Sequence, residues 1–386
     1  MLYEYLNGDG SNWSPYFSVL PTEFNTLMFW SEDELAELQA SAVVGKIGKE
    51  GADEAFTEQL LPVIKEFAET FFAGDERAKQ RAEEMRDARN LELMHKMGSL
   101  IMAYAFDVEP ANPRKDVDEE GFAEEEEDEA LPKGMVPLAD MLNADADRNN
   151  ARLFYEDHYL DMKALKPIRT GEEIFNDYGP LPRSDLLRRY GYVTDNYAQY
   201  DVVEIPMELV EELARKAGIQ SVQRLEYLDE HDIVDSGFDI TFSSPFTIQE
   251  SLSPELVILV ETLLLSQEDF ERLKSKGKLP KPEKMTSDGA DLLHEIIKAR
   301  IAQYPTTLDE DVQSFEHVPS TGAVDLKEQR RAMAKAVRIG EKKILQQARE
   351  ALAELKARIG KSSKRSRVVD DEGDVEMGGV EKKHRA

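Results

Sequence analysis

The apolar pattern of the chain changes twice along its length, and this alternation most constrains the fold. Residues 1–107 carry apolar side chains at helical spacing, as in the run SEDELAELQAS, which starts with a capping serine, Ser31. Residues 132–205 instead hold short β-rich runs such as ARLFYED and YDVVEIP, separated by turn residues. After residue 206 the helical spacing returns, in MELVEELARKAG, SPELVILVETLLLS and DLLHEIIKARIAQY. The pattern predicts an α+β fold, with a small β-rich domain between helical regions.

Two segments have a composition that does not favour packed structure. The run DVDEEGFAEEEEDE, residues 116–129, holds ten acidic residues in fourteen, and its like-charge repulsion predicts that 108–131 forms an acidic disordered loop. The polar residues 359–386 are expected to form a disordered tail. Within this tail KSSKRSR has the composition of a nuclear import signal, although a solvated basic patch would look the same. The helical region after the β-rich domain is therefore expected to span 206–358.

The formal net charge of −30 at pH 7 restricts the partners of the chain. Phosphate binding needs clustered lysine and arginine, so we expect no nucleic-acid partner. A strongly negative field attracts basic proteins, which favours a basic protein substrate, although the charge could equally serve solubility. No stretch approaches the roughly 20 apolar residues that cross a bilayer, so we expect no membrane partner. We expect the chain to act as a monomer.

The sequence gives no sign of a metal site. It contains no cysteine, which excludes disulfides, thiolate zinc sites and a cysteine nucleophile, and its histidines show no ligand spacing. The run DADRNNARLFYE places Asp145, Asp147 and Asn149 at alternate positions of a calcium loop, with Glu156 at the last position. Asn150, however, stands where that loop requires glycine, and the run continues as a strand. We therefore expect no metal.

The segment EIFNDYGPLPRSDLLRRYGYV presents two tyrosines at a tight corner. Its pattern predicts a strand that ends on Tyr178, then a turn, then a short helix that Ser184 caps and Gly191 ends. The helix carries the second tyrosine, Tyr190. A tyrosine supplies a dry aromatic wall and a hydroxyl that donates or accepts without carrying charge. From spacing alone the pair is either corner packing or the wall of a site.

Two motifs in this region carry a family resemblance. PLADMLNADADRNNARLFYE, followed by GEEIFNDYGPLPRSDLLRRYGYV, resembles the C-terminal half of a SET domain of the Rubisco large-subunit methyltransferase class of protein-lysine methyltransferases. PLADMLN is similar to the Asn-His motif of that class, and NDYG is similar to its catalytic-tyrosine motif. Residues 13–39 and 97–106 resemble its helical insert, and the region after 206 resembles its helical substrate-binding domain. The most similar branch is that of the fungal ribosomal lysine methyltransferases.

The resemblance implies a protein-lysine N-methyltransferase that uses S-adenosylmethionine. By analogy with the ribosomal branch, its substrate would be a lysine on a large-subunit (60S) ribosomal protein, and its location the nucleus, with the cytoplasm as a second compartment. Tyr178 would be the catalytic residue and, with Tyr104, would contact the substrate lysine. The residues that the resemblance assigns to the cofactor are Asn143, Ala144, Tyr190 and Ala103.

The chain departs from the family pattern in two ways. The histidine that follows the asparagine of the family motif is Ala144 here, which leaves only backbone groups at that position. The family also begins with strands and a Gly-rich cofactor loop ahead of the helical insert, whereas this sequence starts inside the insert. We therefore expect that the N-terminal part of the SET domain is missing from this sequence. The alternative is a catalytically inactive, SET-derived protein-binding module, against which the intact NDYG argues.

Overall fold

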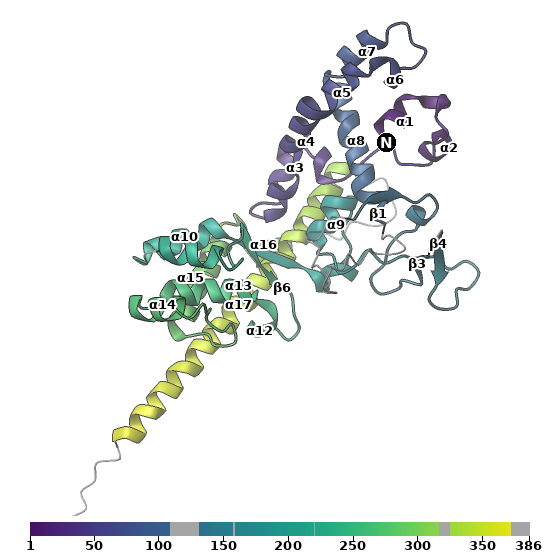
Figure 1. Cartoon of the computed structure of the whole chain (residues 1–386). Coiled ribbons are helices and arrows are strands. Elements are labelled where there is room, and N and C mark those ends of the chain that lie inside the picture. Colours follow the sequence, from purple (N-terminus) through teal and green to yellow (C-terminus); the bar gives the residue numbers. More distant parts are fainter. Residues whose placement is uncertain (109–130, 157–158, 220, 316–324, 372–386) are drawn as a thin grey trace, which may run out of the picture. The chain divides into compact units, whose positions relative to one another are not determined.

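The computed structural model describes residues 1–108, 131–156, 159–219, 221–315 and 325–371 of the chain (Figure 1). These residues form two compact units. Unit 1 comprises Met1–Asp201 and Phe315–Arg338, and unit 2 comprises Val202–Ser314 and the chain from Ile339 onward. Of the predicted acidic loop 108–131, residues 109–130 lie outside the described part of the chain.

Helices make up the first part of unit 1, and the helical spacing predicted there is confirmed. They are α1 (Leu2–Leu6), α2 (Ser14–Phe17), α3 (Glu32–Ala36), α4 (Lys49–Ala55), α5 (Leu61–Glu66), α6 (Ala68–Phe71), α7 (Ala78–Glu84) and α8 (Ala88–Tyr104). Short turns of other helix types are η1 (Gly8–Gly10), η2 (Leu27–Phe29), η3 (Ala42–Lys46), η4 (Phe56–Leu60), η5 (Ala139–Met141) and η6 (Asp195–Tyr200). Ser31 caps α3 in a capping box with Glu34, as its acidic first turn suggested. Phe56, Ile64 and Leu100 lie in the core between these helices.

The strands of unit 1 form two short antiparallel pairs. β1 (Ala105–Asp107) pairs with β2 (Lys133–Met135), and β3 (Ala151–Tyr155) pairs with β4 (Leu160–Ala164). Helix α8 leads directly into β1, which places the end of this long helix beside the β structure (Figure 1).

The strand predicted to end on Tyr178 is not a strand. The segment forms only an isolated parallel bridge, between Asn176 and Ala144. Its backbone also bonds to the start of β3: the Phe175 carbonyl accepts from the amides of Asn150 and Ala151, both at 3.0 Å. A ladder needs one continuous partner strand, and this segment has none.

Helix α9 (Arg183–Tyr190) carries the second tyrosine, and its predicted cap is wrong. Pro182 is the N-cap residue, and Ser184 lies inside the helix. The Arg183 amide donates to the Asp201 carboxylate at 3.1 Å, so a side chain from further along the chain satisfies this free helix-end donor.

The other end of α9 agrees with the prediction. Gly191 ends the helix in the left-handed conformation, with a φ of 75°. A Cβ at this position would lie 2.7 Å from the carbonyl carbon of Asn25, so the close approach also requires glycine. Leu187 of α9 packs in a small core with Trp30 and with Ala334 from the C-terminal helix. The helix end is thus fixed by packing.

Unit 2 is mainly helical, as predicted. Its helices are α10 (Met207–Lys216), α11 (Val222–Asp229), α12 (Ile248–Ser251), α13 (Pro254–Leu264), α14 (Gln267–Lys274), α15 (Ser287–Ala302) and α16 (Leu308–Gln313). A strand pair joins β5 (Val202–Pro206), which lies in the predicted β-rich run YDVVEIP, to β6 (Gly237–Thr241), which the helical pattern after 206 did not predict. In the described ranges no helix is both long and apolar enough to span a membrane.

The last helix, α17 (Leu326–Asp371), supplies residues to both units, up to Arg338 in unit 1 and from Ile339 in unit 2. It continues beyond the boundary predicted at 358, so the first residues of the predicted tail 359–386 are helical up to Asp371, while 372–386 lie outside the described residues. A long helix that has already nucleated extends at little cost per residue, which explains the difference.

Candidate active site

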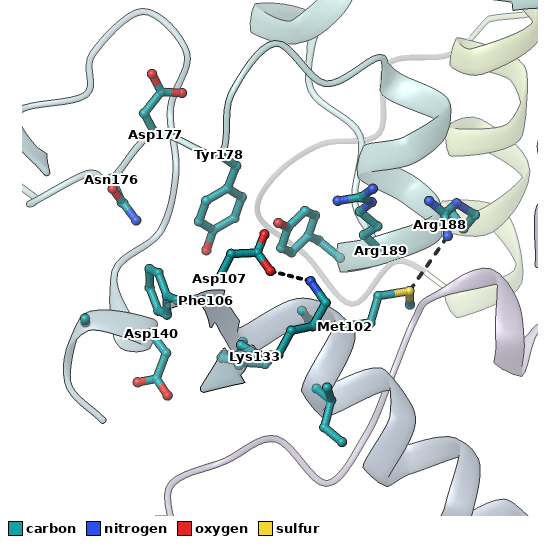
Figure 2. Close-up of a pocket in the computed structure, with 16 residues that line it drawn as sticks. Met102, Phe106, Asp107, Lys133, Asp140, Asn176, Asp177, Tyr178, Arg188 and Arg189 are labelled. Carbon is teal, nitrogen blue, oxygen red and sulfur yellow. Dashed lines mark hydrogen bonds and ion pairs between the residues drawn. The ribbon is translucent and has the colours of Figure 1, made fainter. Parts of the chain in front are cut away.

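A pocket of about 390 Å³ lies in unit 1 where α8, β1 and α9 meet (Figure 2). Its volume is within the roughly 300–1,000 Å³ of small-molecule sites. The lining residues come from 101–107, 176–178 and 188–190, together with Lys133, Ala139 and Asp140. The pocket therefore collects the end of the long helix, the NDYG segment and the last turn of α9.

The two tyrosines of the corner form one wall of this pocket. The rings of Tyr178 and Tyr190 are stacked, with centroids 4.5 Å apart and an interplanar angle of 18°. Burial raises the pKa of Tyr178, and the neighbouring Tyr190 adds to the shift. Burial also raises the pKa of Tyr190, against the opposing charge of Arg189. Both phenols are therefore neutral at pH 7, and the wall is aromatic and uncharged.

The Tyr178 hydroxyl is oriented by the backbone. It donates to the Leu142 carbonyl at 3.1 Å. Leu142 directly precedes the Asn143–Ala144 pair, so the two motifs of the sequence meet at this hydrogen bond. Because the proton is engaged there, the oxygen of Tyr178 keeps its lone pairs for another group in the pocket.

Four of the six predicted site residues line the same pocket: Tyr178, Tyr190, Ala103 and Tyr104. Burial raises the pKa of the Tyr104 phenol, and the nearby Asp140 carboxylate contributes. Three tyrosine side chains and a small alanine therefore line one pocket.

Asn143 and Ala144 do not line the pocket. The Asn143 side chain donates to the exposed Glu173 carboxylate at 2.7 Å. Their backbone instead joins the NDYG segment: the Asn176 amide donates to the Asn143 carbonyl at 2.8 Å, and the Asp145 amide donates to the Asn176 carbonyl at 3.2 Å. In this structure the Asn143–Ala144 segment supports the wall that carries Tyr178.

A buried amide fixes the same wall from the other side. Asn150, 6% exposed, donates through Nδ2 to the Glu173 carbonyl at 2.9 Å and accepts from the Phe175 amide at 2.9 Å. These two bonds replace the strand ladder that the segment lacks. They hold the backbone immediately before Tyr178 in one conformation.

A buried ion pair fixes α9, which carries Tyr190. The Arg183 guanidinium and the Asp201 carboxylate are both buried, and Nη2 lies 2.6 Å from Oδ2. Nε makes two further bonds to the same carboxylate. The first residue of α9 is therefore tied to the end of η6.

Sequence reasoning missed Asp140, which lies in the pocket wall (Figure 2). It is 5% exposed, and its Oδ2 accepts a hydrogen bond from Tyr16, whereas Oδ1 has no hydrogen-bond partner among the described residues. Burial raises the pKa of Asp140, and the Tyr16 hydrogen bond opposes the shift. A charged residue inside the apolar run PLADMLN was the available signal.

The calcium-like run is a hydrogen-bonded turn. The Asp145 carboxylate accepts from the amides of Asp147 and Arg148 at 3.0 and 2.8 Å, and from Asn196 at 3.1 Å. Burial raises the pKa of Asp145, but the Arg148 and Asn196 hydrogen bonds outweigh it and keep the pKa below its usual value. Among the described residues, no group of three or more His, Cys, Asp or Glu side chains could hold a metal ion.

The comparison with known families identifies both units. Residues 36–179 match the SET domain, and residues 212–345 match the Rubisco LSMT substrate-binding domain. The solved structure of Rubisco LSMT bound to AdoMet superposes with a TM-score of 0.60 at 21% identity, over 93% of this chain and 74% of that chain. At this identity the likeness concerns the fold, and it confirms the α+β class with a SET domain and a helical C-terminal domain.

Relatives with assigned names narrow the class. N-lysine methyltransferase SETD6 of Homo sapiens is 30% identical over 373 residues, 90% of this chain and 72% of the relative. Ribosomal lysine N-methyltransferase 4 of Saccharomyces cerevisiae is 33% identical over 275 residues, 66% of this chain. The chain belongs to this family of SET-domain proteins with a Rubisco LSMT-type substrate-binding domain. The matched part spans about half of the yeast relative, 52%.

Proposed function

We propose that the protein is a protein-lysine N-methyltransferase that uses S-adenosylmethionine, with its reaction centre at the pocket of Tyr178 and Tyr190. The observation that carries this proposal is the stacked tyrosine pair in a closed corner beside the backbone of Asn143 and Ala144. Relatives named as N-lysine methyltransferases support it.

The residues present fit the cofactor. S-adenosylmethionine, when bound, supplies a methyl group on a positively charged sulfonium. The stacked rings of Tyr178 and Tyr190 form a wall without positive charge, so this wall does not repel the sulfonium. Ala103 leaves room at the end of α8, and Tyr104 closes the pocket beside it. The pocket volume of about 390 Å³ allows a ligand of this size class.

The pocket would favour the deprotonated, neutral form of the substrate lysine amine. A free lysine has a pKa of about 10.4 and is charged at neutral pH, so it cannot attack a methyl group. Aromatic walls desolvate the amine and lower its pKa, because burial disfavours the charged form. Tyr178 holds its hydroxyl toward Leu142 and can accept a hydrogen bond from the neutral amine. The reaction then depends mainly on orientation, which the rigid corner supplies.

The proposed substrate is a lysine on a large-subunit ribosomal protein. The name of the yeast relative suggests this target, and the net charge of −30 favours basic proteins of this kind. The same charge supports action without a nucleic-acid partner. We also propose that the chain acts as a monomer and in the nucleus, to which KSSKRSR would direct it. A fluorescent fusion without this run should leave the nucleus.

Methyl transfer from radiolabelled S-adenosylmethionine to purified large-subunit ribosomal proteins tests the proposal directly. Label should enter one protein band and disappear when the lysines of that protein have been chemically acetylated beforehand. Stable capture of a basic protein without label would instead indicate the non-catalytic binding module. Absence of both binding and label would contradict the proposed function.

A further inference from the structure

The charged side chains that line the pocket have hydrogen-bond or ion-pair partners within the protein, with one exception. Lys133 Nζ lies 2.5 Å from Asp107 Oδ1, and Arg188 Nε lies 2.9 Å from Asp185 Oδ1. Asp177 accepts from the Gly179 amide at 2.9 Å. Each of these charged groups therefore has a partner within the protein.

Arg189 is the exception. Its side chain is partly buried and lines the pocket, and no described residue forms a hydrogen bond or an ion pair with its guanidinium. In Figure 2 it projects from the last turn of α9, on the side of Tyr178 opposite to Asp140. Its charge acts on the pocket, because it lowers the pKa of Tyr190 against the effect of burial.

A partly desolvated guanidinium favours a planar anion that accepts two parallel hydrogen bonds. The cofactor of the proposed function has one such group, the carboxylate of its amino-acid portion. We propose that Arg189 binds this carboxylate and so positions the amino-acid portion of the cofactor in the pocket; this inference rests on the proposed function.

A simpler role competes with this one. Arg189 is in the last turn of α9, where a cation interacts favourably with the helix dipole without any ligand. The dipole role predicts that removal of Arg189 lowers the stability of the free protein and leaves ligand affinity alone. The carboxylate role predicts that it lowers affinity for ligands that carry the carboxylate.

Two thioethers separate these roles. S-adenosylhomocysteine carries the carboxylate, whereas 5′-methylthioadenosine shares its adenosine and neutral sulfur but has no amino-acid portion. Calorimetry should show that Arg189→Gln weakens S-adenosylhomocysteine binding by about 10- to 30-fold, the range expected for a lost charge-assisted hydrogen bond at a partly exposed site. Binding of 5′-methylthioadenosine should be unchanged.

Arg169→Gln is the matched control, because it removes the same charge from an exposed residue outside the pocket. It should change neither affinity. Arg189→Lys keeps the charge at the helix end but loses the fork of donors, so it should weaken S-adenosylhomocysteine binding less than Arg189→Gln does. This variant also provides the measurement if Arg189→Gln fails to fold.

The possible failures are distinguishable. Equal losses for both thioethers would mean that Arg189 shapes the pocket, and unchanged affinities with a lowered melting temperature would mean that it serves the helix; either result overturns the inference and leaves the proposed function intact. If the unaltered protein bound neither thioether, the cofactor assignment itself would fail, and this inference with it.

Discussion

At the scale of single residues, the pocket depends on groups that are kept neutral. Burial raises the pKa values of Tyr104, Tyr178 and Tyr190, so these phenols keep their protons at neutral pH. Asp140 is pushed in the same direction. An uncharged aromatic wall suits a reaction in which a lysine must lose its own charge before it reacts.

The Tyr178 hydroxyl should matter for rate more than for stability. We expect Tyr178→Phe to lower methyl transfer by roughly 10- to 1,000-fold, about 1.4 to 4 kcal/mol of barrier, because the ring wall stays and only the hydroxyl is lost. Initial rates at saturating cofactor measure this. Tyr192→Phe is the control, since Tyr192 lies near Tyr190, at a ring distance of 6.4 Å, but does not line the pocket. Equal rates for wild type and Tyr178→Phe would rule out the catalytic assignment.

Asp140 should make stability depend on pH. Burial is the main cause that raises its pKa above the ordinary value of an aspartate, so the folded protein holds this proton more tightly than the unfolded chain does. Its contribution to stability is complete below the unfolded pKa and is lost as the pH rises through the folded pKa. Asp140→Asn cannot ionise. The unfolding free energy of the variant should therefore rise relative to that of the unaltered protein as the pH increases above about 4, the ordinary pKa of an aspartate. Urea titrations at each pH measure it, and a difference independent of pH would contradict the shift.

At the scale of elements, α9 is held at both ends. Asp201 bonds to its first residue, Arg183, and Gly191 ends it against the backbone of Asn25. We call these two contacts the first and second anchors of α9. A substitution that weakens either anchor would move Tyr190, which the helix carries into the pocket.

Two glycines with positive φ provide a matched test of the second anchor. Gly179 has a φ of 82° and open space within 4 Å of the place that a Cβ would take, whereas a Cβ at Gly191 would meet the Asn25 carbonyl carbon at 2.7 Å. Gly179→Ala should cost about 1–2 kcal/mol of unfolding free energy, from backbone strain alone. Gly191→Ala should cost a further 1–3 kcal/mol or so, from overpacking against backbone. If chemical denaturation gave similar losses of unfolding free energy for Gly179→Ala and Gly191→Ala, the backbone at Asn25 would have to shift at little cost.

Removing only one partner of the first anchor, the buried Arg183–Asp201 ion pair, should cost much stability. Asp201→Ala leaves the Arg183 charge buried, which we expect to lower the unfolding free energy by about 3–5 kcal/mol. Lys163→Ala is the control, because its pairs with Glu156 and Asp161 are exposed, and it should change stability little. A small loss for Asp201→Ala would mean that water or the second ion-pair partner of Arg183, Asp195 at 3.4 Å, compensates its charge.

Local patterns predicted the helices and the β-rich runs that form β3 and β5, but not the helix termini or the strand β6. Apolar spacing was sufficient for α10, α13 and α15, since a helix satisfies its own backbone. The cap of α9 was mispredicted because Asp201, distant in sequence, replaces Ser184. The motifs located four of the six predicted site residues in the pocket, whereas Arg189 gave no local signal of its role and Asp140 gave only its charge inside the apolar run PLADMLN. Contacts between residues distant in sequence cannot be predicted from the local pattern of one segment.

At the scale of the whole molecule, charge should govern how substrate arrives. With a net charge of −30, capture of a basic protein should be accelerated by long-range attraction that salt screens. We expect kcat/KM for a basic substrate to fall roughly 10-fold between about 0.05 and 0.5 M salt, with kcat nearly constant. Affinity for 5′-methylthioadenosine, a ligand without net charge, serves as the control. A kcat that falls in parallel with kcat/KM would point to a salt effect on the pocket itself.

The path of α17 has a consequence for the order of folding. Unit 1 is built from both ends of the described chain: Arg330 of α17 bonds to Asn25, 305 residues away, at 2.8 Å, and Ala334 and Val337 pack against Trp30. A ribosome makes the chain from its N-terminus, so these partners emerge only after all of Val202–Ser314 has been synthesised. Closing so long a loop is slow, and the apolar face around Trp30 stays open meanwhile. Unit 1, although it is started first, therefore cannot be completed before α17 has been made.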